Sequence, residues 1–169
     1  MSSWTVRQAT DAHAAAMKAI ADAGFATYTE FAPGFRPADE WHEQEAERVA
    51  HRLRDGVMWA RIAEAGDGHP IAHVQIMPAY AGDQPVAGLV HLRQLFVLPD
   101  WWGAGLATEL LAAALAEARA SGYERMRLFT PRDHARARRF YVREGFSATG
   151  LGHQGGEIPL PLVEMAIRL

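Results

Sequence analysis

Residues 95–108 hold the combination of residue types in this chain that is best suited to chemistry. The segment reads Leu-Phe-Val-Leu-Pro-Asp-Trp-Trp-Gly-Ala-Gly-Leu-Ala-Thr, so an apolar run ends at Pro99, two glycines follow and a second apolar run begins. We predict a strand, a turn and the start of a helix, whose free N–H groups and positive dipole end bind a phosphate or diphosphate. The small residues Gly103, Gly105 and Ala107 allow such a ligand to approach the backbone closely. The segment therefore predicts a site for a phosphorylated cofactor.

Metal and thiol chemistry are disfavoured by the residues that the chain offers. It has no cysteine, which excludes disulfides, thiolate metal sites and a cysteine nucleophile. His42 and His51 share one expected helix, but their spacing places them on different faces. We therefore expect no metal site.

Hydrophobic periodicity and turn residues predict the elements that position this segment. Residues 104–121 place apolar side chains on one helical stripe, and Gly122 follows as a stop signal. Strands are expected at residues 4–8, 57–63, 71–77, 88–98, 126–129, 146–149 and 162–169. Further helices are expected at 11–24, 39–55 and 136–144, with a flexible loop at 150–161. The strand–helix–strand order around the glycine turn predicts a βαβ unit inside a mixed sheet.

The bulk composition limits the classes of protein to consider. The chain has 169 residues, of which 49% are hydrophobic and 22% charged, as in one soluble globular domain. A net charge of −3 argues against general nucleic-acid binding, which leaves a basic footprint. No apolar run approaches the ~20 residues that span a bilayer, and residues 1–7 lack the basic-then-apolar pattern of a signal peptide. A cytoplasmic location is the default expectation.

Two motifs, in this order, resemble those of the GCN5-related N-acetyltransferases, the GNAT family. The central motif joins a Leu-x-Val strand to a Gln/Arg-x-x-Gly-x-Gly/Ala turn, which is matched by Leu95-Phe96-Val97, Gly105 and Ala107. The second motif is matched by Ala137-x-x-Phe140-Tyr141-x-x-x-Gly145-Phe146. The order of the expected elements also fits, so the resemblance covers nearly the whole chain. It implies a GNAT-like α/β (α+β) fold, with a mixed, mostly antiparallel sheet of six to seven strands, helices on both faces and one acetyltransferase domain over residues 1–169.

The resemblance implies acetyl-CoA as co-substrate and assigns its site to the first motif. The implied coenzyme-binding residues are Leu95, Phe96, Val97, Trp102, Gly103, Ala104, Gly105, Leu106, Ala107, Thr108 and His134. Two positions depart from the pattern, because Trp102 stands at the Gln/Arg position and His134 where Asn is frequent. We expect diphosphate binding to survive the first change, since backbone N–H groups supply most of it. His134 keeps a hydrogen-bond donor but caps its helix less well than Asn.

Acetyl transfer to an amine sets three chemical requirements. An ammonium with a pKa of about 10.4 must lose its proton, directly or through water. The thioester oxygen needs a fixed N–H donor as it becomes negative, and the leaving thiolate, with a pKa of roughly 8.5, benefits from an acid. By resemblance, Tyr141 is that acid, and Val97 offers its N–H at a point where the strands part and the pantetheine arm pairs like another strand. The alternatives are a core tyrosine packed on Phe140 and an ordinary ladder bond inside the sheet.

The sequence leaves several candidates for the general base. Several family members have a glutamate six residues before the motif's valine, and here this position is His91. Histidine titrates near 6.5, a suitable range for a base at neutral pH. His73, Glu30, Glu40 and a chain of waters are further candidates. The alternative for His91 is an ordinary strand histidine bonded to the backbone.

Two groups of side chains are open to more than one interpretation. The 136–144 helix carries Arg136, Arg138, Arg139 and Arg143. One or two of these arginines could meet the 3′-phosphate of the coenzyme, whereas a solvated face paired with Glu144 explains most of them. The aromatic residues of 25–41 either line an acceptor pocket or pack the early helices onto the sheet.

The sequence therefore predicts an N-acetyltransferase that moves an acetyl group from acetyl-CoA to a primary amine. We expect direct attack, because no cysteine and no serine in a nucleophile turn offers itself for an acyl-enzyme. The acceptor is a small molecule or peptide that the sequence does not name. No nucleic-acid or membrane partner is expected, and the resemblance makes a homodimer one expected assembly. Alternative functions are a non-catalytic acyl-CoA-binding sensor or scaffold, and transfer of another acyl group or transfer to a hydroxyl.

Overall fold

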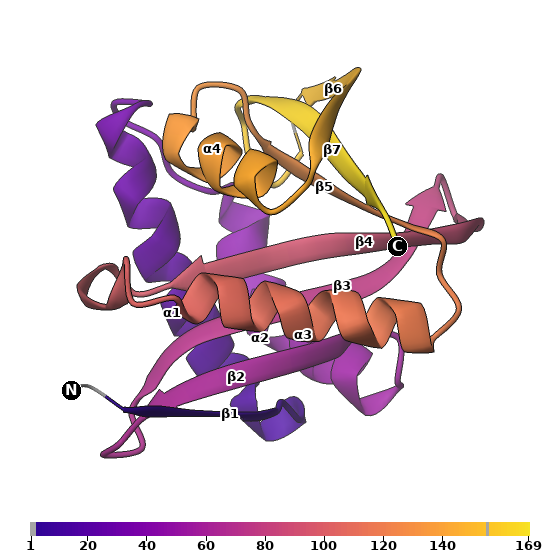
Figure 1. Ribbon diagram of the computed structural model, residues 1–169. Coiled ribbons are helices and arrows are strands. Elements are labelled where there is room, and N and C mark those ends of the chain that lie inside the picture. Colours follow the sequence, from indigo (N-terminus) through magenta and orange to yellow (C-terminus); the bar gives the residue numbers. More distant parts are fainter. Residues whose placement is uncertain (1–2, 155) are drawn as a thin grey trace.

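Seven strands form one sheet in the computed structural model, which describes residues 3–154 and 156–169. The strands are β1 (Trp4–Gln8), β2 (Trp59–Ala65), β3 (Pro70–Ala81), β4 (Gln84–Val97), β5 (Arg125–Pro131), β6 (Ser147–Gln154) and β7 (Pro161–Arg168). Their order across the sheet is β1-β2-β3-β4-β5-β7-β6 (Figure 1). Within these described residues, every pair of neighbours is antiparallel except β4 and β5. The expected mixed and mostly antiparallel sheet is therefore confirmed.

Helices cover both faces of this sheet. The α-helices are α1 (Ala14–Ala26), α2 (Asp39–Arg54), α3 (Leu106–Ala120) and α4 (Ala135–Arg143), and the short 3₁₀ segments are η1 (Asp11–His13), η2 (Thr27–Glu30) and η3 (Pro99–Trp101). In Figure 1, α3 lies in front of the sheet, whereas α1 and α2 lie behind it. The α3 helix joins β4 to its parallel neighbour β5, which is the expected βαβ unit.

Clusters of buried side chains hold the helices on the sheet. The expected stripe of α3 is buried against the sheet through Leu106, Leu110, Leu111, Ala114 and Ala118. A second cluster joins α1 and α2 to β2 and includes Met17, Val49 and Ile62. A third cluster is aromatic and is built from Phe25, Tyr28 and Trp41, with Phe31, Phe35 and Phe96 packed against it. The aromatic residues of 25–41 therefore pack α1 and α2 onto the end of β4.

The largest difference from the expected elements lies near the end of the chain. The sequence predicts a strand that ends at residue 149 and a flexible loop over 150–161, but β6 continues to Gln154 and pairs with β7. The prediction was wrong for 150–154 because all eight residues of β6 are exposed, so no apolar alternation marks the strand. Gly150 and Gly152 also read as breakers, although Gly152 pairs with Val163.

Candidate active site

The β4 strand loses its partner on one side before it ends. Within the described residues, β4 pairs with β5 through Leu89, Val90 and His91, although β4 continues to Val97. On its other side, β4 stays paired with β3 as far as Val97. The strands β4 and β5 therefore part after His91, as Figure 1 shows, and leave one edge of β4 open.

The backbone of β4 turns polar groups into this opening. The N–H of Leu98 donates to the carbonyl oxygen of Ile71 at 2.9 Å, so Leu98 faces β3. Because successive residues of an antiparallel strand direct their backbone groups to opposite sides, Leu95 and Val97 face the opening. In agreement, the indole N–H of Trp102 donates to the carbonyl oxygen of Val97 at 2.8 Å. The N–H groups of Leu95 and Val97 are therefore placed to pair with an extended ligand rather than with a strand.

The turn after β4 leaves a run of backbone N–H groups available. Gly103 and Gly105 have φ values of +79° and +92°, which glycine adopts without strain, and a Cβ at either position would meet nothing within 4 Å. Gly105 is the N-cap of α3 and contributes no side-chain cap. Among the described residues, no backbone hydrogen bond uses an N–H of residues 103–108, and the first paired N–H is that of Glu109, 3.1 Å from the oxygen of Gly105. The positive end of the α3 dipole adds to this run, which therefore suits an anion.

Both features open into one cavity of about 950 Å³. Of the sequence-predicted coenzyme residues, the cavity wall includes Leu95, Phe96, Val97, Trp102, Gly103, Gly105, Leu106, Ala107, Thr108 and His134. Ala104 is not part of this wall. Tyr141 and His91, predicted as acid and base, line the same cavity. One cavity thus contains the unpaired backbone N–H groups of residues 103–108, the phenol of Tyr141 and the imidazole of His91.

Tyr141 places its ring in the core and its hydroxyl at the cavity. The ring packs edge-on against Phe140 and Phe146, with centroids 5.2 and 5.5 Å away. Among the described residues, nothing forms a hydrogen bond with the hydroxyl. Burial raises the pKa of Tyr141 above its ordinary value, and the nearby Tyr28 adds to this rise. The phenol therefore stays protonated near neutral pH and can donate a proton.

A second phenol, Tyr28, lines the same cavity and was not singled out from the sequence. It reaches the wall from η2, and burial raises its pKa, which Arg136 partly opposes. Its ring lies edge-on to His134, with centroids 5.1 Å apart. His134 is the N-cap residue of α4 but makes no side-chain cap, and it stacks on Phe31 at 4.8 Å. Burial, followed by the charge of Arg136, lowers the pKa of His134 to about 4, so the ring is neutral.

His91 lies at the point where the strands part, since it is the last β4 residue in register with β5, opposite Arg127. Its Nδ1 is buried and has no hydrogen-bond partner among the described residues. Burial, followed by the charges of Arg127 and Arg93, lowers the pKa of His91 to about 4. A backbone hydrogen bond with Arg127 acts in the opposite direction on this pKa, in line with a strand histidine bonded to the backbone. The ring is therefore neutral near physiological pH and a weak base.

His73, a candidate for the base, is remote from His91. Met77 is the β3 partner of His91, and His73 lies four residues further along β3, which corresponds to about 13 Å. His73 is fully buried, and its Nε2 lies 3.0 Å from Oε1 of Gln94. Burial lowers the pKa of His73 to about 4. The hydrogen bond to Gln94 and the complete burial indicate a structural role.

The two carboxylate candidates also lie outside the cavity wall. Glu40 forms an ion pair with Nη2 of Arg48 at 2.8 Å, and Glu30 is exposed at the end of η2. Across the described residues, no group of three or more His, Cys, Asp and Glu side chains is placed to hold a metal ion. His69 precedes His73 by four residues, but His69 is exposed before β3 whereas His73 lies in the core.

Trp102 and Arg136 connect the two sides of the opening. The guanidinium of Arg136, at the start of α4, lies 3.2 Å from the ring centroid of Trp102. Trp102 follows β4, so the stacked pair spans from the end of β4 to α4. Arg139 and Arg143 also line the cavity, whereas Arg138 donates to the carbonyl oxygen of Arg132 at 3.0 Å. The α4 helix thus presents positive charge along the same side as the bare N–H groups.

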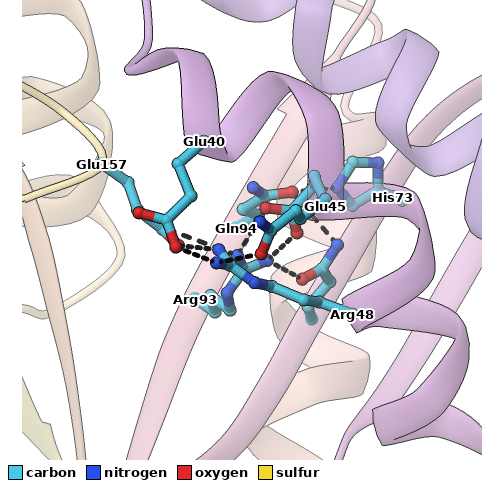
Figure 2. Close-up of polar contacts among 9 residues, drawn as sticks. Glu40, Glu45, Arg48, His73, Arg93, Gln94 and Glu157 are labelled. Carbon is cyan, nitrogen blue, oxygen red and sulfur yellow. Dashed lines mark hydrogen bonds and ion pairs between the residues drawn. The ribbon is translucent and has the colours of Figure 1, made fainter.

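A buried ion pair joins α2 to a bulge in β4. The β3–β4 register shifts between Gln75, which faces Gln94, and Ile76, which faces Leu92, so Arg93 has no opposite residue. Nη1 of Arg93 lies 2.7 Å from Oε1 of Glu45, a residue only 1% exposed. Arg93 also donates to Oε1 of Gln75 at 2.9 Å. Figure 2 shows Arg93, Glu45 and Gln94 within one group of polar contacts.

The connection between β6 and β7 belongs to the same network. Glu157 forms ion pairs with Arg48 at 3.0 Å and with Arg93 at 3.6 Å (Figure 2). The N–H of Ala38 donates to the carbonyl oxygen of Glu157 at 3.1 Å. Glu157 and Ile158 also line the cavity. This connection is therefore held against α2 at the edge of the cavity.

These polar residues of α2 were missed because a helix rich in Glu and Arg resembles a solvated helix. The signal was present in the spacing of Trp41, Glu45 and Val49, which lie four residues apart on one helical stripe. A carboxylate between two large apolar residues on one stripe must be buried, and therefore needs a partner. Arg52 continues the same side of the helix and lines the cavity.

None of the helices in the described residues is both long enough and apolar enough to cross a membrane.

Comparisons with known proteins agree with this arrangement. An uncharacterized N-acetyltransferase of Archaeoglobus fulgidus is 32% identical to this chain over 108 residues, which cover 63% of this chain and 69% of that protein. The structure of the PaiA N-acetyltransferase of Thermoplasma acidophilum, in complex with coenzyme A, superposes with a TM-score of 0.73 at 17% identity and covers 99% of each chain. A GNAT-family acetyltransferase of Staphylococcus aureus Mu50 superposes with a TM-score of 0.76 at 14% identity, again over 99% of each chain.

The family assignment rests on a match that spans most of the chain. The model of the acetyltransferase (GNAT) family matches residues 22–146, which run from α1 past the end of α4 and include the open edge of β4, the glycine turn and Tyr141. This chain therefore belongs to the GNAT family of acetyltransferases, and it is an N-acetyltransferase with acetyl-CoA as co-substrate.

Proposed function

We propose that this enzyme transfers the acetyl group of acetyl-CoA to the primary amine of a small acceptor by direct attack. The observation that carries the proposal is the meeting, in one cavity, of the bare N–H groups of residues 103–108 with the phenol of Tyr141. An anion site alone would suit any nucleotide-binding protein. A protonated phenol beside it adds a proton donor, which a leaving thiolate requires.

The residues present fit the coenzyme. The N–H run at residues 103–108 is suited to the diphosphate, because it combines unpaired donors with the positive end of α3. The backbone of Leu95 is suited to the amide-bearing arm, which would pair with β4 as an added strand, and the N–H of Val97 is left for the thioester oxygen. Acetyl-CoA supplies the activated acetyl thioester. Ala107 and Thr108 line the cavity beside the N–H run, and the space around Gly103 and Gly105 is open, so no side chain obstructs the approach of the diphosphate at these two glycines.

Two groups of the chain stabilise the developing charges. The N–H of Val97 points into the opening and donates to the thioester oxygen as negative charge builds on it. Tyr141 gives its proton to the departing sulfur and regains one from the amine nitrogen. In the balanced reaction the N–C bond forms and the C–S bond breaks. The ammonium loses two protons, of which one ends on the thiol and the other in solvent.

His91 serves as a neutral acceptor for the incoming amine rather than as a strong base. Because burial and two arginines lower the pKa of His91 to about 4, the ring is neutral near pH 7. It accepts a hydrogen bond from the amine and passes the proton on through water. The chain has no cysteine, which is consistent with direct attack and with no acyl-enzyme.

We further propose that residues 1–169 act as one acetyltransferase domain. The element order supports this, because the N-terminal helices and the C-terminal strands both contribute residues to the same cavity wall.

The experiment that tests the proposed function measures release of free coenzyme thiol from acetyl-CoA with a panel of amines and alcohols of matched size. We expect release with amines and not with alcohols, together with an acetamide product detected by mass spectrometry. Release with alcohols would replace the proposal by O-acetylation. Tight coenzyme binding with no release on any acceptor would identify a sensor or scaffold instead.

A further inference from the structure

The cavity wall includes an arginine, Arg52, for which the described residues provide no partner. Arg52 lies near the end of α2 and lines the cavity. Its Nη1 is buried, yet it forms no hydrogen bond among the described residues. None of the ion pairs formed by these residues includes Arg52. A guanidinium has five N–H donors and stays charged, so a buried Nη1 without an acceptor is costly.

Neighbouring charges do not remove this deficit. Arg48 and Arg93 share the carboxylates of Glu45 and Glu157, at distances between 2.7 and 3.6 Å. Glu40 is also taken by Arg48. Burial lowers the pKa of Arg52, and the charge of Arg93 lowers it further, although Glu45 and Glu157 act in the opposite direction. The carboxylates of this region are therefore committed to the other two arginines (Figure 2).

The charged side chains of the wall are unequal in number. Within the described residues, the wall includes five arginines, Arg52, Arg93, Arg136, Arg139 and Arg143, and one carboxylate, Glu157. Three of these arginines come from α4, whereas Arg52 comes from α2 and Arg93 from β4. Counted with their partners outside the wall, Arg48, Arg52 and Arg93 match Glu40, Glu45 and Glu157 in charge. What Arg52 lacks among the described residues is therefore a hydrogen-bond acceptor at Nη1 rather than a balancing charge. Among the described residues of the wall, the one carboxylate, Glu157, is paired with Arg48 and Arg93, so a polycationic acceptor has no unpaired carboxylate to bind.

The remaining walls are apolar and the space is limited. Phe25, Trp41, Met77, Phe96 and Phe129 contribute apolar or aromatic surface to the cavity. The total of about 950 Å³ is close to the upper size of a single small-molecule site, and here it must hold two reactants. The connection that carries Glu157 also lies against α2. These limits favour a small acceptor over a protein tail.

We infer that the acceptor is a small amine that also carries a carboxylate, as a free amino acid with an apolar or aromatic side chain does, and that Arg52 binds the carboxylate. This inference rests on the proposed N-acetylation and names its substrate class. The carboxylate would supply the acceptor that Nη1 of Arg52 lacks, by a charge-assisted hydrogen bond. The apolar side chain would lie against the aromatic wall, and the amine would face the opening of β4.

The test compares each amino acid with the amine that lacks only its carboxylate, such as phenylalanine with phenethylamine and leucine with isopentylamine. Coenzyme thiol release gives kcat/KM for each member of a pair, with acetyl-CoA saturating. In the unaltered enzyme we expect kcat/KM to be about 10- to 100-fold higher for the amino acid, as expected for one charge-assisted hydrogen bond in a desolvated site. The effect should lie mainly in KM, because the carboxylate is remote from the reacting atoms.

The variant Arg52→Gln should bring this ratio close to one, while kcat/KM for the plain amine changes little. Arg54→Gln is the matched control, because Arg54 lies on the same helix but is exposed and pairs with Asp11 at 3.3 Å. The control should keep the full ratio. Arg52→Lys should retain part of it, since it keeps a positive charge but not the planar guanidinium.

Several outcomes would overturn the inference. A ratio near one in the unaltered enzyme, or an unchanged ratio in Arg52→Gln, would show that Arg52 binds no carboxylate. Turnover of other amines but of neither member of the pairs would also overturn it and leave the proposed N-acetylation standing. Absence of turnover with every amine tested would overturn both.

Discussion

Replacing Tyr141 by phenylalanine removes one oxygen atom from the cavity and tests the proposed acid directly. The ring packs against Phe140 and Phe146, and phenylalanine preserves these contacts. The hydroxyl has no hydrogen-bond partner among the described residues, so its loss leaves no buried group unpaired. We therefore expect the free energy of unfolding to change by less than about 1 kcal/mol.

The expected loss of turnover follows from the leaving group. A positioned acid typically contributes about 10²- to 10⁴-fold. A thiolate with a pKa of roughly 8.5 leaves without much help near neutral pH, so the contribution lies toward the lower end. We expect kcat to fall by about 10- to 1000-fold in Tyr141→Phe, with the coenzyme Kd nearly unchanged.

Three measurements check this expectation. Thiol release at saturating substrates gives kcat, titration with coenzyme A gives Kd, and denaturant unfolding gives stability. Tyr80→Phe is the matched control, because Tyr80 is 38% exposed on β3 and lies outside the cavity wall. An acetyl thioester of a more acidic thiol should recover part of the loss in Tyr141→Phe, since its thiolate needs less protonation.

Unchanged turnover in Tyr141→Phe would remove the hydroxyl from the mechanism. A loss of stability well above 1 kcal/mol, or a parallel loss of coenzyme affinity, would contradict the reasoning from the unpaired hydroxyl. In that case the oxygen would have a structural partner.

Three further perturbations test other parts of the site. Gly105→Ala forces an L-residue to adopt φ of +92°, at a cost of roughly 1–2 kcal/mol, and should weaken coenzyme binding by about 5- to 30-fold as the turn relaxes. The control Gly82→Ala, with φ of +65° in the β3–β4 turn, should lose similar stability and bind the coenzyme normally. Because His91 has a pKa of about 4, it is already largely deprotonated at pH 5. The value of kcat/KM should therefore rise with pH as the acceptor amine deprotonates, without an inflection near 6.5. An inflection near 6.5 that is absent in His91→Ala would refute the assignment of His91 as a neutral acceptor. Glu45→Ala leaves the guanidinium of Arg93 without its nearest carboxylate and should lower the free energy of unfolding by about 3 kcal/mol, which corresponds to a Tm lower by about 6–12 °C. The double variant Glu45→Leu with Arg93→Met should lose much less stability in calorimetry. Equal losses would contradict a buried ion pair.

The fold was largely predictable because its elements carry strong local signals. The stripe of α3 and the glycine that precedes it specify a helix with an open N-terminus, and the apolar run before Pro99 specifies the strand that leads to it. The extension of β6 to Gln154 was not predictable, since an exposed edge strand buries no side chain that would mark it. Its pairing with β7 depends on contacts that are distant in the sequence.

The candidate site divides in the same way. The coenzyme side rests on backbone geometry, which glycine and proline spacing encode locally. The proposed acceptor side depends on side chains from α2, the β4 bulge and the β6–β7 connection, which only the tertiary fold brings together. The ionisation of His91 was also beyond the sequence, because burial and the charge of Arg127 are properties of the folded protein.

The short ladder between β4 and β5 makes the stability of the folded enzyme depend on bound coenzyme. Within the described residues, the register between these two strands covers Leu89–His91 on β4, so the C-terminal strands are joined to the rest of the sheet mainly by side chains of the shared core, such as Val90, Met126 and Met165. A coenzyme arm seated in the gap would bridge the two parts as an extra rung. At a concentration one hundred times its Kd, a ligand that binds only the folded state adds about 2.7 kcal/mol of stability. Amide protons of β5 and β7 should then exchange more slowly, and the supply of acetyl-CoA would protect this protein against proteolysis as well as feed its reaction.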